Sequence, residues 1–333
     1  MDTPEKTRVA VVFGGGSTEH AISSVGAAEI LSALDADDEF EIVPVGVTRE
    51  GQWVLPGAAA SGASTDLVPT GADVAVVDAR AGVARLAGID VVFPVLRGAF
   101  GHEGTIQGLL EMADLPYVGS GVFASSAALD RDHLRKLAVA AGLPVAPYAV
   151  LRGGTPLDEA GRSRLTLPVA VLPARGHGGE TLVGDWADLD AAVAAAREVD
   201  GKVVVASVPA GRRVTVGVLD AGGAGAGGAP EASVPGELTE DGVTAPAELP
   251  RDVERAVRDL AVQAFVALDC AGLARVDLTV TPAGEVTLDA IDTMPAFEPG
   301  APFPSVWSAS GVRYDTLVSR LIRAAVRRGT GLH

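Results

Sequence analysis

Short apolar runs alternate with amphipathic stretches along most of this chain. The run at residues 8–13 predicts a buried strand, and residues 18–34 place Ile22, Val25, Ala28 and Ile30 near one helical face. Further strands are predicted at 40–47, 88–93, 147–151, 168–172, 203–207, 273–281 and 285–292, and further helices at 103–112, 122–129, 131–141, 186–198, 250–268 and 314–328. Alternation of strands and helices predicts an α/β fold with a parallel sheet.

Glycine and proline mark the breaks in this pattern. Residues 56–72 are rich in Gly, Ala, Ser and Pro and predict a surface loop, and residues 220–228 are a glycine-rich, low-complexity hairpin tip. Pro282-Ala-Gly284 separates two alternating strands and predicts a hairpin. No internal repeat is present.

Composition and charge narrow the class of protein. The chain has 333 residues with 48% hydrophobic and 21% charged residues, enough to build a sizeable core, and a net charge of −17. Such an acidic surface repels phosphate backbones, so we expect no nucleic-acid partner. No apolar run is long enough to cross a membrane, and the N-terminus carries no signal-peptide core, so a cytoplasmic location is expected. A single cysteine, Cys270, excludes an internal disulfide framework.

Lysine is scarce, which limits any chemistry that needs it. Of the 26 basic residues only Lys6, Lys136 and Lys202 are lysines. The glycine loop Gly14-Gly-Gly-Ser-Thr-Glu-His20 matches neither GxGxxG nor GxxxxGK[ST], so by itself it predicts only a tight strand-to-helix turn.

Several sequence blocks together are more specific than that loop. They read VVFGGGSTEHAISSVGAAEIL, GTIQGLLEMADLPYVGSGVFASSAALD, AAGLPV, ARVDL and EVTLDAIDTMPAF, in this order. In these blocks the chain resembles the D-alanine–D-alanine ligase family of ATP-grasp enzymes, over essentially its whole length.

The resemblance implies a fold, a reaction and an assembly. It implies an ATP-grasp-like α/β architecture with an N-terminal domain at 1–120, a central subdomain at 121–206 and a C-terminal subdomain at 207–333. In the family, Mg-ATP is clamped between the last two, one D-alanine carboxylate is phosphorylated, and the amine of a second D-alanine attacks it. A homodimer is also implied.

Part of the family's substrate site is kept. By resemblance Glu19 binds the ammonium of the first D-alanine, Arg275 faces the reacting carboxyl group, and Asp277 is the first magnesium ligand. Arg275 and Asp277 are two residues apart on one strand and therefore share a face. Alternatively, they form only a salt bridge with each other. Arg97, at the position of a family histidine, and Ser120 complete the candidate substrate-binding set.

The nucleotide side departs from the family pattern. Leu172 and Arg131 stand where the family has its two phosphate-binding lysines. Arg175 begins the loop that covers the phosphates in the family, and in this chain that loop has no serine. Ala206 and Ser207 stand at the family's adenine-binding positions, and Arg213 stands at its ribose-binding position. Ala290 and Asp292 stand at two of its metal-binding positions, and the family's ω-loop is missing between Gly236 and Pro246. Arg131 and Arg175 remain candidate phosphate donors, and Asp277 and Asp292 candidate metal ligands.

Three functions follow from this mixture. The preferred interpretation is a ligase-like protein that has lost most ATP and Mg²⁺ contacts, needs no cofactor, and binds an amino acid, peptide or other carboxylate. The second is a divergent but active ATP-dependent carboxylate–amine ligase whose metal site uses Asp292 and Asp289. Asp289 would face that site only if its strand slipped by one residue. The third is a nucleotide-independent enzyme in which His102 and Glu103, beside a helix N-terminus, provide acid–base catalysis.

Overall fold

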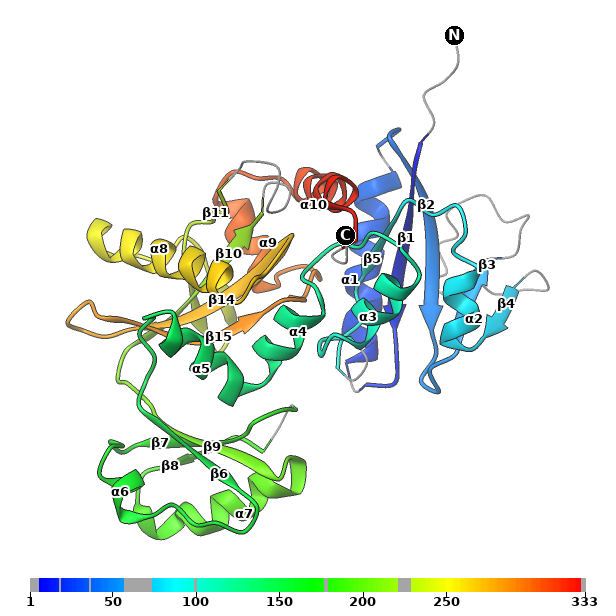
Figure 1. Cartoon of the computed structure of the whole chain (residues 1–333). Coiled ribbons are helices and arrows are strands. Elements are labelled where there is room, and N and C mark those ends of the chain that lie inside the picture. The colour runs from blue at the N-terminus through cyan, green and yellow to red at the C-terminus, as the bar shows by residue number, and fades with distance from the viewer. Residues whose placement is uncertain are drawn as a thin grey trace.

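The chain folds into three bodies, each built around one sheet (Figure 1). The computed structural model describes residues 6–17, 19–35, 37–56, 74–98, 101–176, 179–220 and 229–330. The predicted loop at 56–72 and the glycine-rich tip at 220–228 lie almost entirely outside these residues. No described helix is long and apolar enough to cross a membrane.

The N-terminal body contains a five-stranded sheet in the order β4-β3-β2-β1-β5. Its strands are β1 (Thr7–Gly14), β2 (Phe40–Val47), β3 (Trp53–Pro56), β4 (Val74–Val77) and β5 (Val91–Pro94), and its helices are α1 (His20–Asp35), α2 (Ala79–Ala84) and α3 (Thr105–Met112). β1 runs parallel to β2 and β5, as predicted, whereas β3 and β4 pair antiparallel, so the sheet is mixed. The C-terminal helix α10 (Tyr314–Arg328) returns to pack on α1, so both ends of the chain share one core.

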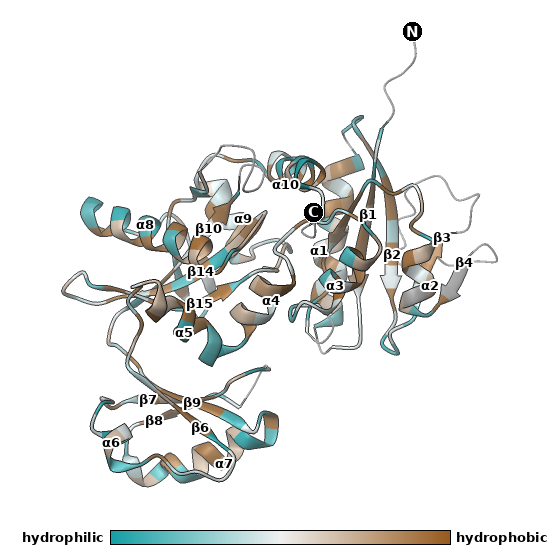
Figure 2. Ribbon diagram, in the orientation of Figure 1, coloured by the Kyte–Doolittle hydropathy of each residue, from teal (hydrophilic) through white to brown (hydrophobic). Residues whose placement is uncertain are grey.

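The central body is a four-stranded antiparallel sheet in the order β6-β9-β7-β8. Its elements are β6 (Tyr148–Arg152), α6 (Glu159–Arg162), β7 (Val169–Pro173), β8 (Thr181–Val183), a 3₁₀ turn (Trp186–Asp188), α7 (Leu189–Val199) and β9 (Lys202–Ser207). Apolar residues of β7, β9 and α7 form its core, which appears brown in Figure 2.

The C-terminal body is a six-stranded sheet in which β13-β12-β10-β14-β15 follow in order and β11 pairs with β10. The strands are β10 (Arg212–Leu219), β11 (Glu231–Ala232), β12 (Gly236–Thr239), β13 (Gly242–Thr244), β14 (Leu273–Val280) and β15 (Val286–Asp292), with helices α8 (Arg251–Ala267) and α9 (Pro302–Ala309). Helices α4 (Val122–Leu129) and α5 (Arg131–Ala140) also contribute apolar residues to this body's core. The predicted subdomain at 121–206 therefore has its sheet in one body and its first two helices on another.

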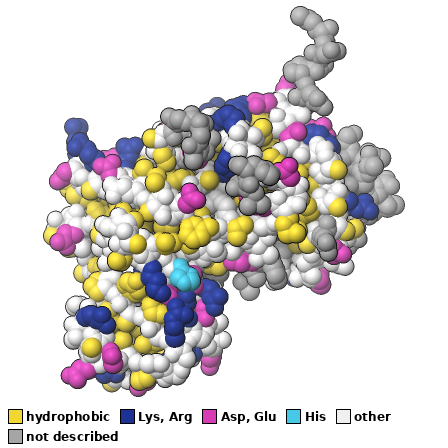
Figure 3. Space-filling model, viewed as in Figure 1, with side chains coloured by type: hydrophobic (Ala, Val, Ile, Leu, Met, Phe, Trp, Pro, Cys, Tyr) yellow, Lys and Arg dark blue, Asp and Glu magenta, His cyan; other side chains and the backbone are white. Residues whose placement is uncertain are grey.

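A buried ionic network connects α5 to the central sheet. The ammonium of Lys202, at the start of β9, lies 2.7 Å from one carboxylate oxygen of Asp130 and 3.5 Å from Asp132. Lys136 and Arg152 bond Asp132 from the solvent side, at 2.9 and 2.8 Å. Figure 3 shows basic side chains gathered where the central body meets the rest of the molecule. Lys202 thus stabilises the junction between two bodies.

Candidate functional site

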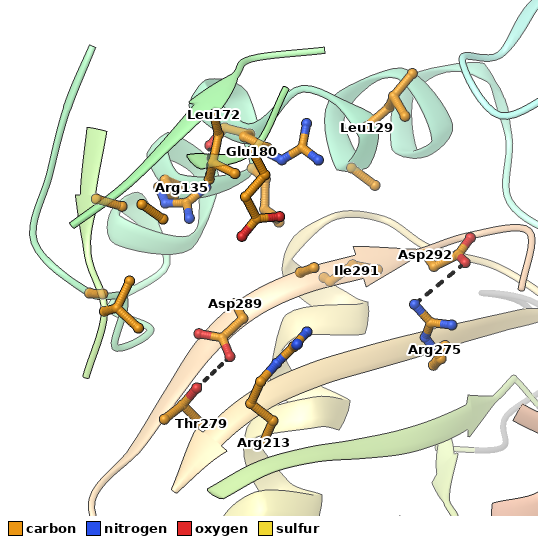
Figure 4. A pocket seen from close by; sticks show the side chains of 18 of the residues that line it. Leu129, Arg135, Leu172, Glu180, Arg213, Arg275, Thr279, Asp289, Ile291 and Asp292 are labelled. Atoms are coloured by element: carbon orange, nitrogen blue, oxygen red, sulfur yellow. Dashed lines mark hydrogen bonds and ion pairs between the residues drawn. The ribbon is translucent and has the colours of Figure 1, made fainter. Parts of the chain in front are cut away.

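A cleft of about 660 Å³ lies where the three bodies meet. Its walls come from α4, α5, β7 and β9 on one side and from β10, β14 and β15 on the other, with the loops after β1 and β5 closing one end. Clefts that bind small molecules usually measure about 300–1,000 Å³, so this volume suits a metabolite. Figure 4 shows the two walls facing each other.

One end of the cleft, the Glu19 end, is formed by Glu19, Arg97, His102, Arg275 and Asp292. A guanidinium nitrogen of Arg97 lies 3.5 Å from the Glu19 carboxylate, and the other terminal nitrogen donates to the Met294 carbonyl at 3.1 Å. Glu19 Oε2 and Arg97 Nε are buried without a hydrogen-bond partner. This end therefore offers one acceptor and one donor to a ligand.

The turn before Glu19 depends on glycine at position 14. Gly14 has φ +97°, and a Cβ there would lie 2.3 Å from the Val47 carbonyl oxygen. Because only glycine takes this conformation without strain, the chain can turn directly from β1 toward α1. The turn brings Glu19 to the mouth of the cleft.

Arg275 holds two carboxylates on β14 and β15. Its Nε and one terminal nitrogen each lie 3.1 Å from an oxygen of Asp277, and the same terminal nitrogen lies 3.9 Å from Asp292. Thr215 donates its hydroxyl to Asp277 at 2.7 Å. Asp277 is buried and its oxygens are already bonded within the protein, so Arg275 and Asp277 do form the salt bridge that the sequence allowed.

Asp292 is ionised in a cationic surrounding. Burial opposes its ionisation, but Arg275, His102 and Arg97, with the Met294 N–H, hold the pKa of this carboxyl below its ordinary value. Asp292 therefore carries its charge at neutral pH and balances the arginines of the Glu19 end.

A β-bulge places Asp289 on the cleft wall. β14 and β15 pair Asp277 with Ala290 and then Leu278 with Leu288, so Asp289 is an extra residue on its strand. Both Asp289 and Ala290 line the cleft. From the sequence, Asp289 is expected to reach this wall only if the whole strand slips by one residue; the bulge brings it there locally and leaves its neighbours in register.

The other end of the cleft, the Arg213 end, is formed by Arg131, Arg135, Glu180, Arg213 and Asp289. Arg135 is 8% exposed; one terminal nitrogen donates to the Arg131 carbonyl at 3.0 Å, and its Nε has no partner. Arg131 bonds the carbonyls of Pro173 and Gly176 at 3.0 and 3.2 Å. Asp289 accepts the Thr279 hydroxyl at 2.6 Å, and burial raises the pKa of its carboxyl.

The structure brings together seven of the eleven residues that the sequence singled out. Those lining the cleft are Glu19, Arg97, His102, Arg131, Arg275, Asp289 and Asp292. Asp277 lies behind Arg275, Ser120 exchanges hydrogen bonds with Ala271, and Arg175 pairs with Asp200 at 3.0 Å, away from the cleft lining. Glu103 also lies outside the lining.

Sequence reasoning missed Arg135 and Glu180 as cleft residues. Arg135 stands four positions after Arg131 on α5, and residues at this spacing share one helical face. The spacing from a candidate phosphate donor was therefore a usable signal for Arg135. Glu180 follows a glycine-rich loop, a position that gives no comparable indication.

The metal site implied by the resemblance would use positions 277, 290 and 292. Here Arg275 occupies both Asp277 and Asp292, and Ala290 has no side-chain oxygen. No group of three His, Cys, Asp or Glu side chains among the described residues is placed to hold a metal ion. As arranged, these residues do not fit the magnesium site of the family.

Comparisons with known proteins agree with this architecture. Residues 8–120 match the family model described as "D-ala D-ala ligase N-terminus", and residues 137–323 match "D-ala D-ala ligase C-terminus". The VanG D-Ala:D-Ser ligase of Enterococcus faecalis superposes with a TM-score of 0.85 at 26% identity, covering 96% of this chain and 100% of that one. The D-alanine–D-alanine ligase of Coxiella burnetii gives 0.82 at 28% identity, covering 97% and 95%.

The fold and cleft define an ATP-grasp protein. Curated relatives named D-alanine–D-alanine ligase include those of Frankia casuarinae, 45% identical over 98% of both chains, and Mycobacterium avium, 43% identical over the whole of both. This chain belongs to the D-alanine–D-alanine ligase family. The alignment with the Frankia ligase spans 383 positions, more than the 333 residues here, so segments of that ligase have no counterpart in this chain.

Proposed function

We propose that this family member binds a small zwitterion or carboxylate in its cleft and does not run the Mg-ATP-dependent ligation. The observation that carries the proposal is the double engagement of Arg275. The arginine expected to face the substrate carboxyl group, and the two carboxylates expected to hold magnesium, are bonded to one another.

The Glu19 end supports binding of a zwitterion. The buried, unpartnered Glu19 Oε2 suits an ammonium group, and the unpartnered Arg97 Nε suits a carboxylate. Charge-assisted hydrogen bonds of this kind are each worth about 1.5–3 kcal/mol. An amino acid or the end of a peptide would satisfy both groups at once.

The opposite wall supports the loss of nucleotide chemistry. Leu172 and Ala206 place apolar side chains on the cleft where the resemblance implies a phosphate lysine and an adenine contact, and no lysine is among the described residues that line it. Nucleotide binding in the micromolar to sub-millimolar range represents roughly 6–8 kcal/mol, so the loss of several charged contacts would remove most of it.

The second candidate is a divergent, active ATP-dependent ligase, and two observations favour it. Curated relatives that are 43–46% identical over the full chain carry the name D-alanine–D-alanine ligase. In addition, the bulge brings Asp289 to the cleft, next to the position where the family carries its bridging carboxylate. ATP and Mg²⁺ would be required only under this candidate. The homodimer stays a prediction under both.

One experiment separates the candidates. Calorimetric titrations with Mg-ATP and with D-alanine, each alone and together, would be combined with a coupled assay for ADP release. We expect heat from D-alanine or another unblocked amino acid without ATP, and no ADP release above that of a protein-free control. D-alanine-dependent ADP release would refute the proposal and establish the second candidate.

A further inference from the structure

The two ends of the cleft differ in charge. At the Glu19 end, Arg97 and Arg275 face Glu19 and Asp292, so the charges that line this end balance when His102 is neutral. At the Arg213 end, three arginines (Arg131, Arg135, Arg213) face two carboxylates (Glu180, Asp289), which leaves one positive charge. A ligand with its anionic group at the Arg213 end would match this difference.

Unsatisfied groups at the Arg213 end point to an anion. Arg135 is more than nine-tenths buried, yet its Nε has no partner. The side chain of Arg213 makes no hydrogen bond or ion pair with any described residue and interacts with Asp289 only at longer range. Figure 4 places the two guanidinium groups on opposite walls, with the cleft between them. An oxyanion located there would accept from both.

Asp289 does not meet this need. It lies near both arginines and one of its oxygens accepts the Thr279 hydroxyl at 2.6 Å, but it forms no ion pair with either arginine. The Nε of Arg135 therefore remains available to the anion of a ligand.

Strand register gives the distance between the two ends. Arg213 on β10 pairs with Thr279 on β14, and Arg275 stands four residues from Thr279 on the same strand. At about 3.4 Å per residue, the backbone positions of Arg275 and Thr279, which mark the two ends, are roughly 14 Å apart along the sheet. An extended peptide rises about 3.3–3.6 Å per residue, so three to five residues span this distance. The lining between the ends includes Leu172, Ala206 and Ile291, which suit small apolar side chains.

We propose that the cleft binds an extended peptide of three to five small residues, with its ammonium group at Glu19 and its terminal carboxylate between Arg135 and Arg213. This rests on the proposed function and specifies the class of ligand. The orientation follows from the unpartnered acceptor of Glu19, which no group at the Arg213 end matches, and from the unpartnered Arg135 Nε beside the positive excess of the Arg213 end.

The test uses calorimetry with alanine oligomers of one to five residues, in both the L and D series, on the intact chain. We expect the best oligomer of three to five residues to bind at least tenfold more tightly than alanine. N-acetylation and C-terminal amidation of that oligomer should each weaken binding at least tenfold.

Variants then assign each end of the peptide. In Arg213→Gln, amidation should no longer matter while acetylation still does, and in Glu19→Gln the reverse should hold. Arg212→Gln is the matched control, because Arg212 is adjacent on β10 but pairs with Glu237 and does not line the cleft; both penalties should persist in it.

Each contrary result has a separate meaning. Alanine binding as tightly as every oligomer, or an amidation penalty that persists in Arg213→Gln, would overturn the extended ligand and leave the proposed function standing. Absence of binding by alanine and all oligomers, or D-alanine-dependent ADP release, would overturn both.

Discussion

Replacing Arg275 with alanine should lower the free energy of unfolding, because Arg275 compensates the charge of a buried carboxylate. Arg275 makes two hydrogen bonds of 3.1 Å to Asp277, and the two side chains are only 22% and 10% exposed. Removing one member of a buried pair leaves an uncompensated charge and typically costs 3–5 kcal/mol. Thr215 continues to donate to Asp277, so we expect a loss of about 3 kcal/mol in the free energy of unfolding at pH 7.5.

The loss should also depend on pH in a defined direction. In the folded wild type the pKa of Asp292 is lowered, so its contribution to stability is present above the unfolded pKa of about 3.9 and is lost as pH falls through the folded value. Without Arg275, burial of Asp292 is opposed only by His102, Arg97 and the Met294 N–H, so its pKa rises and it protonates at a higher pH than in the wild type. The difference in stability between wild type and variant should therefore shrink on acidification from pH 7.5 to 4.5.

Urea unfolding followed by tryptophan fluorescence at both pH values measures this difference. Arg320→Ala serves as the control, because Arg320 forms an exposed pair with Glu231, and such pairs contribute about 0–1 kcal/mol. A loss below 1 kcal/mol for Arg275→Ala at pH 7.5, or a loss that grows on acidification, would refute the reasoning. If the alanine variant does not fold, Arg275→Gln provides the same comparison.

Three further results are expected. Lys202→Met should lower the free energy of unfolding by about 3–5 kcal/mol, because Lys202 is buried between Asp130 and Asp132. Lys136→Met should lower it by less than about 1 kcal/mol, because Lys136 is half exposed. Urea titrations measure both losses, and equal effects would contradict the buried network. Binding of a peptide carboxylate should strengthen as the pH is lowered, because Asp289, whose pKa is raised by burial, takes up a proton at a higher pH than an ordinary aspartate; calorimetry on Asp289→Asn should show a weaker pH dependence. Gly217→Ala should unfold at a temperature several degrees lower, because its Cβ would lie 2.5 Å from Nε1 of Trp307; an unchanged melting curve would disprove this close packing.

The sequence located most elements because their pattern is local. The strand predicted at 40–47 is β2, and the helices predicted at 122–129 and 314–328 are α4 and α10, all with the same bounds. The side on which a helix packs is not local. α4 and α5 lie on the C-terminal sheet because their apolar faces match that core, and the 3.6-residue repeat indicates a buried face without indicating its partner.

The sequence predicted only those site residues that lie within recognisable sequence blocks. Glu19 and Arg275 were recognisable from the blocks around them, and both line the cleft. The bulge at Asp289 was not, because it arises from a difference in length between two paired strands. The role of Lys202 was also hidden, since its partners Asp130 and Asp132 lie some 70 residues earlier and meet it only in the folded chain.

The absence of lysine from the described lining of the cleft has a consequence for how the site responds to its surroundings. All five basic side chains other than histidine that line it are arginines, whose guanidinium groups stay protonated at every physiological pH. Acylating or carbamylating reagents that consume amines would modify the half-exposed Lys136 and leave the charges of the cleft intact. Acetylation and alkaline conditions that neutralise lysines would therefore leave the five arginine charges of this cleft unchanged.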